Sequence, residues 1–541
     1  MNERDRLQKL AEEHFRSLYE RLPIQATLLG IHQYDRLLGD MSSESIAQLV
    51  ADCKARLTEL RRIDRYRLGI HDAVEYDLVQ ADIHNNLIWF EELADWQRDP
   101  NFYVDTPLYG LFALLVRDFA PAEERARSVL ARLKALPGFL RLGTTNVLQA
   151  PRTFVEVAIE TAEGGLQFFQ ETIPAFAEQV PTLRTELLEA NEEAASALAS
   201  HLDYLRSDLL PGASDAFAIG REMFEKKLRW EHMLGLSVEQ LRALGQRVFT
   251  ETERALREMA DRIDPRKTWP ELVEEARNDH PSADDLLGAF GRELARLRQF
   301  IADRGIVTIP SNEKLQLVDT PAFARSTIPY AAYMPPAPFE ESQQGQFWVT
   351  PLDANGPPER RMAHLRENCH GTLPLTALHE AYPGHHLQLV RSNNVSSTIR
   401  KHISSNLFAE GWAFYCEQLM GEVGYYRDWR PRLFQLKDQL WRAARVLIDV
   451  DMQTGKMSFE QAVRLLVEQA HLTEGAALTE VRRYAMTPTQ PMSYLAGKQQ
   501  ILNLRAEFSS LPMKDFHDGL LSSGTIPVEL VRREMRVKLG R

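Results

Sequence analysis

The spacing of apolar residues constrains the fold of this chain more than any other feature of its sequence. From residue 1 to about residue 305, apolar side chains recur every three or four positions, which is the period of helices that bury one face. A helix is expected at 238–263, where Ser237 and Gln240 provide a capping-box opening. We therefore predict a mainly α fold in which residues 1–304 form a helical scaffold domain. An alternative is that some of these helices form the far wall of a substrate cleft.

The helical period stops near Gly305 and gives way to short alternating segments. Apolar and polar residues alternate at 315–320, 329–334 and 345–350, and proline-rich turns separate the three segments. We predict a small antiparallel sheet within 305–353. This sheet would open a second domain, 305–541, that carries the chemistry, and the two domains would merge around one deep cleft.

Composition and charge exclude several classes of protein. The 541 residues are 44% hydrophobic and 26% charged, as in soluble globular proteins. A formal net charge of -12 disfavours a nucleic-acid partner. Three cysteines are too few for a disulfide framework or a four-cysteine zinc site. The charged start of the chain and the lack of a long apolar stretch predict no secretory signal, no membrane partner and a cytoplasmic location.

Residues 377–388 contain the motif with the clearest chemical meaning. His379 and Glu380 are adjacent, and His385 and His386 follow them closely. Neutral imidazoles bind zinc, and a neighbouring carboxylate can take a proton from a water on the metal. The motif therefore predicts a zinc site with Glu380 as the general base, and ordinary helix-end or surface histidines are the alternative.

The second histidine does not stand where the common H-E-x-x-H pattern has it. That position is Pro383, which cannot bind a metal. On an ideal helix His385 points ~120° away from His379, whereas His386 points back but lies ~10 Å along the axis. Proline kinks a helix and the following Gly384 allows unusual backbone angles, so a local bulge would return His385 to the usual place. We favour His385 as the ligand and keep His386 as the alternative.

A carboxylate on the next predicted helix supplies a third ligand. Glu410 lies among large apolar side chains, and a buried carboxylate needs a partner such as a metal. Glu417 shares its helix face and is either an alternative ligand or a partner that orients one. Gly411 is small and would let this helix approach another closely.

Two residues near the C-terminus are candidates for a role beside the metal. Tyr494 lies in the first turn of a predicted helix, where its hydroxyl could stabilise the oxyanion of a tetrahedral intermediate. Lys498 follows one turn later and could act with it. A buried structural tyrosine is the alternative for Tyr494.

Four stretches of the sequence resemble one large bacterial family. Residues 379–388 and 409–413 are similar to its central signature, HEAYPGHH followed by AEGWA, and 23–35 and 487–498 are similar to its N-terminal and C-terminal signatures. The family is labelled only as a domain of unknown function, and it is itself similar to helical zinc metallopeptidases such as thimet oligopeptidase and carboxypeptidase Taq. The resemblance implies a large zincin-like fold whose deep cleft favours short peptides. One departure is Gln453, where many relatives have histidine; if that position contacts substrate, specificity is altered here.

These features together predict a zinc-dependent hydrolase, in particular a metallopeptidase. We expect one zinc ion held by His379, His385 and Glu410, with a fourth position open for water. The predicted substrate is a short peptide. In H-E-x-x-H peptidases an edge strand pairs with the substrate backbone, and 345–350 is the candidate for that strand. A purely structural sheet is the alternative.

We expect three further residues to contact the substrate: Tyr333, Trp348 and Lys498. Two other classes of function remain open. A metal-dependent amidohydrolase acting on a non-peptide or conjugated small amide would use the same zinc and base, and Gln453 keeps this alternative open. A non-enzymatic helical scaffold would bind no metal. If the protein is an enzyme, another divalent ion could take the place of zinc. The oligomeric state is not predicted.

Overall fold

The computed structural model describes residues 2–321, 325, 328, 330–353 and 356–540. The chain divides into two compact units. The first comprises 1–217, 337–342 and 397–402, and the second comprises 218–336, 343–396 and 403–541. Residues 218–304 belong to the second unit because their helices pack with the C-terminal helices. The predicted domain boundary at 304 stays a prediction.

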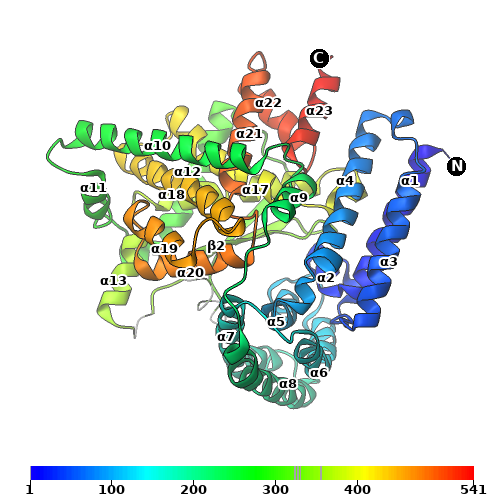
Figure 1. Ribbon diagram of the computed structural model, residues 1–541. Helices are drawn as coiled ribbons and strands as arrows, with labels where there is room; N and C mark the ends of the chain where they lie inside the picture. The colour runs from blue at the N-terminus through cyan, green and yellow to red at the C-terminus, as the bar shows by residue number, and fades with distance from the viewer. Residues whose placement is uncertain (1, 322–324, 326–327, 329, 354–355, 541) are drawn as a thin grey trace. The chain divides into compact units, whose positions relative to one another are not determined.

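The first unit is built from helices alone among its described residues. One group, α1, α3 and α4, packs side by side, and a second group contains α5, α6, α7 and α8 (Figure 1). The helices are α1 (Glu3–Arg21), α2 (Pro23–Leu29), α3 (Ser43–Leu60), α4 (Ile70–Leu87), α5 (Asn101–Val116), α6 (Ala122–Asn146), α7 (Arg152–Ala177), α8 (Arg184–Tyr204) and α16 (Thr398–His402). Side-chain caps fix the start of two of them, since Asn2 accepts from the amide of Asp5 and Ser42 accepts from that of Ser45.

The second unit is also mainly helical, which confirms the predicted mainly α class. Its helices are α9 (Arg221–Trp230), α10 (Val238–Ile263), α11 (Trp269–Ala276), α12 (Leu286–Arg304), α13 (Pro358–Glu367), α14 (Leu373–Glu380), α15 (His385–Asn393), α17 (Asn406–Glu422), α18 (Trp429–Gln453), α19 (Phe459–Glu468), α20 (Glu474–Met486), α21 (Ser493–Glu507), α22 (Met513–Leu521) and α23 (Val528–Lys538). Helix α10 has the predicted bounds and the predicted capping box of Ser237 and Gln240. It packs along α18, and α17 packs along α21 (Figure 1).

A three-stranded sheet precedes the motif helices, as predicted, but its pairing differs from the prediction. The strands are β1 (Lys314–Asp319), β2 (Ala331–Met334) and β3 (Gln344–Val349), in the spatial order β1-β3-β2. Strand β3 runs parallel to β1 and antiparallel to β2, so the sheet is mixed and not antiparallel.

The central position of β3 overturns the expectation that 345–350 is an edge strand. Both sides of β3 are hydrogen-bonded to neighbouring strands, which leaves no free edge for a substrate. The physical reason lies in burial: Phe347, Trp348 and Val349 are consecutive and all buried, as in a strand covered on both faces. Strands β1 and β2 form the two edges.

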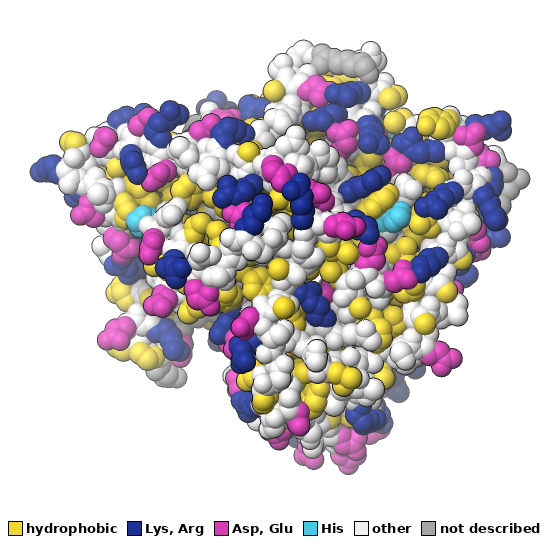
Figure 2. Space-filling model, viewed as in Figure 1, with side chains coloured by type: hydrophobic (Ala, Val, Ile, Leu, Met, Phe, Trp, Pro, Cys, Tyr) yellow, Lys and Arg dark blue, Asp and Glu magenta, His cyan; other side chains and the backbone are white. Residues whose placement is uncertain are grey.

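Two surface properties bear on the expected partners. Within the described part of the chain, every helix is too short or too polar to span a bilayer. Lysine and arginine side chains alternate with aspartate and glutamate over the face shown in Figure 2.

Candidate metal centre

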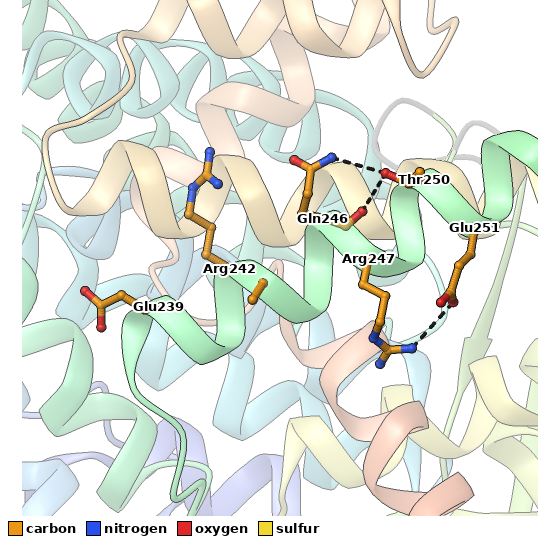
Figure 3. A pocket seen from close by; sticks show the side chains of 7 residues that line it. Glu239, Arg242, Gln246, Arg247, Thr250 and Glu251 are labelled. Atoms are coloured by element: carbon orange, nitrogen blue, oxygen red, sulfur yellow. Dashed lines mark hydrogen bonds and ion pairs between the residues drawn. The ribbon is translucent and has the colours of Figure 1, made fainter.

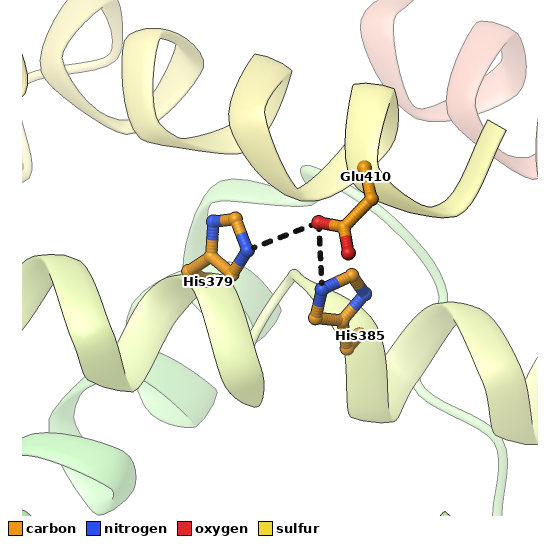
Figure 4. Close-up of side chains that lie close together, drawn as sticks. All are labelled: His379, His385 and Glu410. Carbon is orange, nitrogen blue, oxygen red and sulfur yellow. Dashed lines mark ion pairs between the residues drawn. The ribbon is translucent and has the colours of Figure 1, made fainter. Parts of the chain in front are cut away.

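Three segments of the second unit bring one side chain each to a common point (Figure 4). His379 lies near the end of α14, His385 begins α15, and Glu410 lies near the start of α17. Oε2 of Glu410 is 3.6 Å from Nε2 of His379 and 3.4 Å from Nε2 of His385. All three candidate ligand atoms lie within 4.8 Å of one another.

These separations fit a bound metal ion better than direct hydrogen bonds. Four ligands at ~2.1 Å around a tetrahedral zinc ion lie ~3.4 Å from one another. The two nitrogen–oxygen distances, 3.4 and 3.6 Å, match that spacing and are longer than usual hydrogen bonds. Oε2 of Glu410 is buried and has no hydrogen-bond partner among the described residues. The donor set, two imidazoles and one carboxylate, is one that zinc accepts.

A break between α14 and α15 brings His385 to this point. Helix α14 ends at Glu380, and the next helix begins at His385, so the chain interrupts the helix where a bulge was expected. A Cβ atom on Gly384 would lie 1.9 Å from the carbonyl oxygen of His379, so only glycine fits this close approach. The indole of Trp412 donates a hydrogen bond of 2.8 Å to the carbonyl of Pro383 and holds the break against α17.

His386 faces away from the cluster and belongs to a separate buried network. Its side chain has no exposed surface. Nε2 donates to Oε1 of Glu313 at 3.0 Å, and Nδ1 lies 2.9 Å from the hydroxyl of Tyr333. The hydroxyl of Tyr382 also donates to Glu313. The geometry therefore places His385, and not His386, with the other two candidate ligands.

Glu417 lies behind His379 and does not join the cluster. Its Oε1 accepts from Nδ1 of His379 at 2.8 Å, and only 2% of Glu417 is exposed. This bond orients the ring so that Nε2 points toward Glu410. Glu417 thus has the geometry of an orienting partner, which was one of the two roles expected for it.

Opposite charges in the cluster shift the pKa of both partners. Burial alone would raise the pKa of Glu410, but the charges of His385 and His379 hold it well below its usual range. Burial alone would lower the pKa of His379, but Glu410 and Glu417 outweigh this effect and raise it to about 10. The Glu410 carboxylate is therefore ionised, as a metal ligand must be, whereas the ring of His379 would lose its extra proton when a metal binds.

Close packing of α17 and α21 places Tyr494 near the cluster. A Cβ on Gly411 would lie 2.5 Å from the backbone of Gly497, and one on Gly497 would lie 2.0 Å from the carbonyl of Leu407. Gly411 thus permits the close approach predicted from its size. Burial raises the pKa of Tyr494, and the charge of Glu410 raises it further. The tyrosine hydroxyl therefore keeps its proton.

Two of the residues expected to contact the substrate, Trp348 and Lys498, are buried. Trp348 is fully buried, and its indole donates to Gln346 at 2.8 Å, so it offers no surface to a substrate. Lys498 is only 2% exposed and donates to Gln439 at 2.6 Å. Its burial lowers the pKa of its ammonium group to about 7. Both residues pack the interior because neighbouring elements cover them, which their sequence positions do not reveal.

The remaining predicted residues, Glu380 and Tyr333, lie on different elements. Glu380 ends α14 and is half-buried, and its charge acts on both His379 and Tyr333. Tyr333 lies on edge strand β2, and its hydroxyl contacts the network behind the cluster. Glu313, which joins that network, was missed because a single carboxylate before a strand has no distinguishing pattern in the sequence.

Gln453 does not contact the candidate centre through its side chain. It is fully buried at the end of α18 and donates to the carbonyls of Tyr484 and Ala485 at 3.1 and 3.2 Å. Its side-chain oxygen Oε1 accepts from the backbone amide of Ile219 at 3.2 Å. The glutamine therefore cross-links three backbone segments.

A surface hollow elsewhere on the second unit has the character of an ordinary helix face (Figure 3). Its lining residues all come from α10: Glu239, Arg242, Ala243, Gln246, Arg247, Thr250 and Glu251. Arg247 pairs with Glu251, and Arg242 pairs with Asp451 at 2.9 Å. The candidate metal ligands do not line it.

Fold and site together define a mainly helical protein with a His/His/Glu cluster suited to a divalent metal. The chain belongs to the family described as "Bacterial protein of unknown function (DUF885)", whose model matches residues 23–535. This confirms the resemblance to a bacterial family of unknown function. No curated protein matches the chain.

Two solved structures share the fold along nearly the whole chain. A "putative lipoprotein of unknown function" from Shewanella oneidensis is 24% identical, covers 98% of this chain and 99% of its own, and superposes with a TM-score of 0.82. A "putative lipoprotein" from Colwellia psychrerythraea is 19% identical over the full length of both chains, with a TM-score of 0.83.

These relatives contradict the expected cytoplasmic location. Both are described as lipoproteins, a class held at a membrane by attached lipid. The expectation rested on the charged residues at the start of the sequence, and those residues do not decide where a folded domain resides. The prediction of a cytoplasmic protein is wrong.

Proposed function

We propose that this protein is a zinc-dependent hydrolase, and in particular a metallopeptidase that cleaves short peptides. One observation carries the proposal: Oε2 of Glu410 is buried between Nε2 of His379 and Nε2 of His385, yet has no hydrogen bond among the described residues. Leaving a buried carboxylate oxygen without a partner is costly, and a cation shared with the two imidazoles would remove that cost.

The residues around the cluster support hydrolysis as its chemistry. A divalent metal, when bound, supplies Lewis acidity that polarises a carbonyl and acidifies water. Glu380, which ends α14 beside His379, would accept a proton from the attacking water and return it to the leaving amine. Tyr494 keeps its hydroxyl proton near Glu410 and would donate a hydrogen bond to the developing oxyanion.

The structure weakens the main argument for a non-peptide amide as substrate. That argument rested on Gln453, whose side chain is buried and bonded to backbone groups. It cannot change substrate specificity by direct contact. A scaffold without metal is disfavoured by the unpartnered oxygen of Glu410. We therefore propose a peptide substrate.

The proposal is tested by comparing the wild type with Glu380→Gln. Elemental analysis should find about one zinc per chain in both proteins, because Glu380 is not a ligand. Hydrolysis of a panel of di- to pentapeptides should fall by roughly 10²–10⁴-fold in the variant, the usual contribution of a general base. Wild-type protein that binds no zinc after reconstitution, or a variant of undiminished activity, would overturn the proposal.

A further inference from the structure

Two arginines on α18 lie against Tyr494, the residue proposed to stabilise the oxyanion. The guanidinium carbon of Arg445 lies 4.8 Å from the centre of the Tyr494 ring, and that of Arg442 lies 5.9 Å from it. Arg442 also lies 5.7 Å from the ring of Phe414, one helical turn after Glu410 on α17. Two positive charges therefore lie beside the tyrosine that is proposed to act at the metal centre.

Both arginines have buried donors without partners among the described residues. The side chain of Arg445 is only 5% exposed; it donates to Tyr484 at 2.8 Å and to Glu480 at 3.1 Å, but its Nη1 has no hydrogen bond. The side chain of Arg442 is 13% exposed, and its Nε and Nη1 have no hydrogen bond. Nη1 of Arg442 forms an ion pair with Oδ1 of Asp438 at 3.5 Å, which leaves Nε as its donor without any charged or hydrogen-bonded partner in the described part of the chain.

Stacking on aromatic rings does not satisfy these donors. Arg445 lies between the rings of Trp441 and Tyr494, at 4.2 and 4.8 Å, and such contacts stabilise its charge. The N–H groups of a stacked guanidinium nevertheless point outward in the plane of the group. Buried donors of this kind carry a cost that an anionic ligand would remove.

We propose that Arg442 and Arg445 bind the C-terminal carboxylate of the peptide substrate. The guanidinium fork matches a carboxylate geometrically, and a substrate anchored there would present a bond near its C-terminus to the metal centre. The inference rests on the proposed function, which it deepens by assigning a substrate class: short peptides with a free C-terminus, cut near that end.

The test compares wild type with Arg442→Gln on three libraries of N-acetylated tripeptides. One library carries free C-terminal acids, the second carries C-terminal amides, and the third carries amides with glutamate in the sequence. Wild type should prefer the acids by about 10–100-fold in kcat/KM, the usual gain from hydrogen bonds to a charged group. Arg442→Gln should lose this preference, and the loss should appear in the KM of the acids.

Matched variants separate a binding role from a structural one. Arg430→Gln removes the same charge from α18, but the guanidinium of Arg430 is already paired with Asp428 at 2.7 Å. This control should keep the preference for acids. Arg442→Lys keeps the charge without the fork and should retain part of it. Equal use of acids and amides by the wild type, or equal use of the glutamate amides and the acids, overturns the proposal.

Binding to the inactive variant Glu380→Gln distinguishes the two proposals from each other. Calorimetry should show that zinc-loaded Glu380→Gln binds the acid library more tightly than the amides, and that adding Arg442→Gln abolishes the difference. Selective binding without wild-type hydrolysis would reject the peptidase proposal and keep the anion subsite. Hydrolysis without selective binding would reject the subsite alone.

Discussion

Each of the two units contains a buried histidine beside a carboxylate, but the hydrogen bonding of the two carboxylates differs. In the first unit, Nε2 of His14 lies 2.7 Å from Oδ2 of Asp82, and Asn86 donates to the same oxygen at 3.1 Å. In the second unit, Oε2 of Glu410 lies 3.4 and 3.6 Å from two imidazole nitrogens and has no hydrogen bond among the described residues. The first is a hydrogen-bonded structural pair, and the second has the spacing of ligands that hold a divalent ion.

The largest effect should come from removing the charge of each carboxylate in turn. Glu410→Gln should weaken zinc binding by more than ~100-fold, because an amide is a poor ligand. Loss of a partner that only orients a ligand has a smaller effect. Asp82→Asn should leave zinc content and activity unchanged and cost about 1–3 kcal/mol of stability. Zinc titration and thermal unfolding of both variants provide the measurement. Equal zinc affinities in the two variants would contradict the conclusion that only the cluster in the second unit binds metal.

A smaller effect is expected at the residue that orients His379. Glu417→Gln should weaken zinc affinity by roughly 10–100-fold, because the ring of His379 loses its charged partner. The matched control is Glu422→Gln on the same helix, where the carboxylate pairs with Arg505 at 2.8 Å. Zinc titration should show no change in this control. An effect of the same size there would mean that helix charge, and not ring orientation, controls affinity.

Alanine substitutions at two glycines should change the stability in opposite directions, because only Gly411 lies at the helix contact that builds the site. Gly411→Ala should destabilise the protein by about 1–3 kcal/mol, because the added methyl would lie 2.5 Å from backbone of α21. Gly164 lies within α7 of the first unit with nothing within 4 Å of a Cβ, so Gly164→Ala should stabilise by about 0.5–1 kcal/mol. Denaturant unfolding measures both changes. If Gly411→Ala left the free energy of unfolding unchanged, α17 and α21 could move apart without loss of stability.

The smallest effect concerns pH and the first unit. Burial alone would lower the pKa of His32, but Asp35 at 2.9 Å and Glu340 at 3.5 Å raise it to about 9. The folded state therefore favours the protonated ring, so this stabilisation is complete below pH ~6.5 and disappears as pH rises through 9.

Unfolding by denaturant across this range should show a loss of roughly 1–2 kcal/mol, allowing for the partial exposure of the ring. His32→Asn should remove most of this dependence of stability on pH. A variant with the same pH dependence as the wild type would assign the effect to other groups.

The outcome of individual predictions shows which features a sequence carries locally. Helix α10 was predicted with its bounds because Ser237 and Gln240 cap it within one turn. The three strands were located because alternation is also a local pattern. Their pairing was wrong, since the choice of the middle strand depends on contacts between residues distant in sequence.

The candidate site divides in the same way. His379, Glu380 and Glu410 were recognised from residue type and spacing, and His385 was favoured from the backbone properties of Pro383 and its neighbour. The two arginines proposed to bind the substrate carboxylate were not recognised, because α18 carries other charged residues, and one of them, Asp449, is also buried one turn after Arg445. Charged residues on helices are usually solvated, so only the observed burial distinguishes Arg445.

The sequence by itself determined the helical class, the caps and the residues able to hold a metal, because these depend on side-chain chemistry and on neighbours within a few positions. The tertiary structure decided that His385 and not His386 faces Glu410, that β3 is the central strand, and that Trp348 and Lys498 are buried. Each of these outcomes depends on which segments pack together, and packing is set by the summed burial of the whole unit.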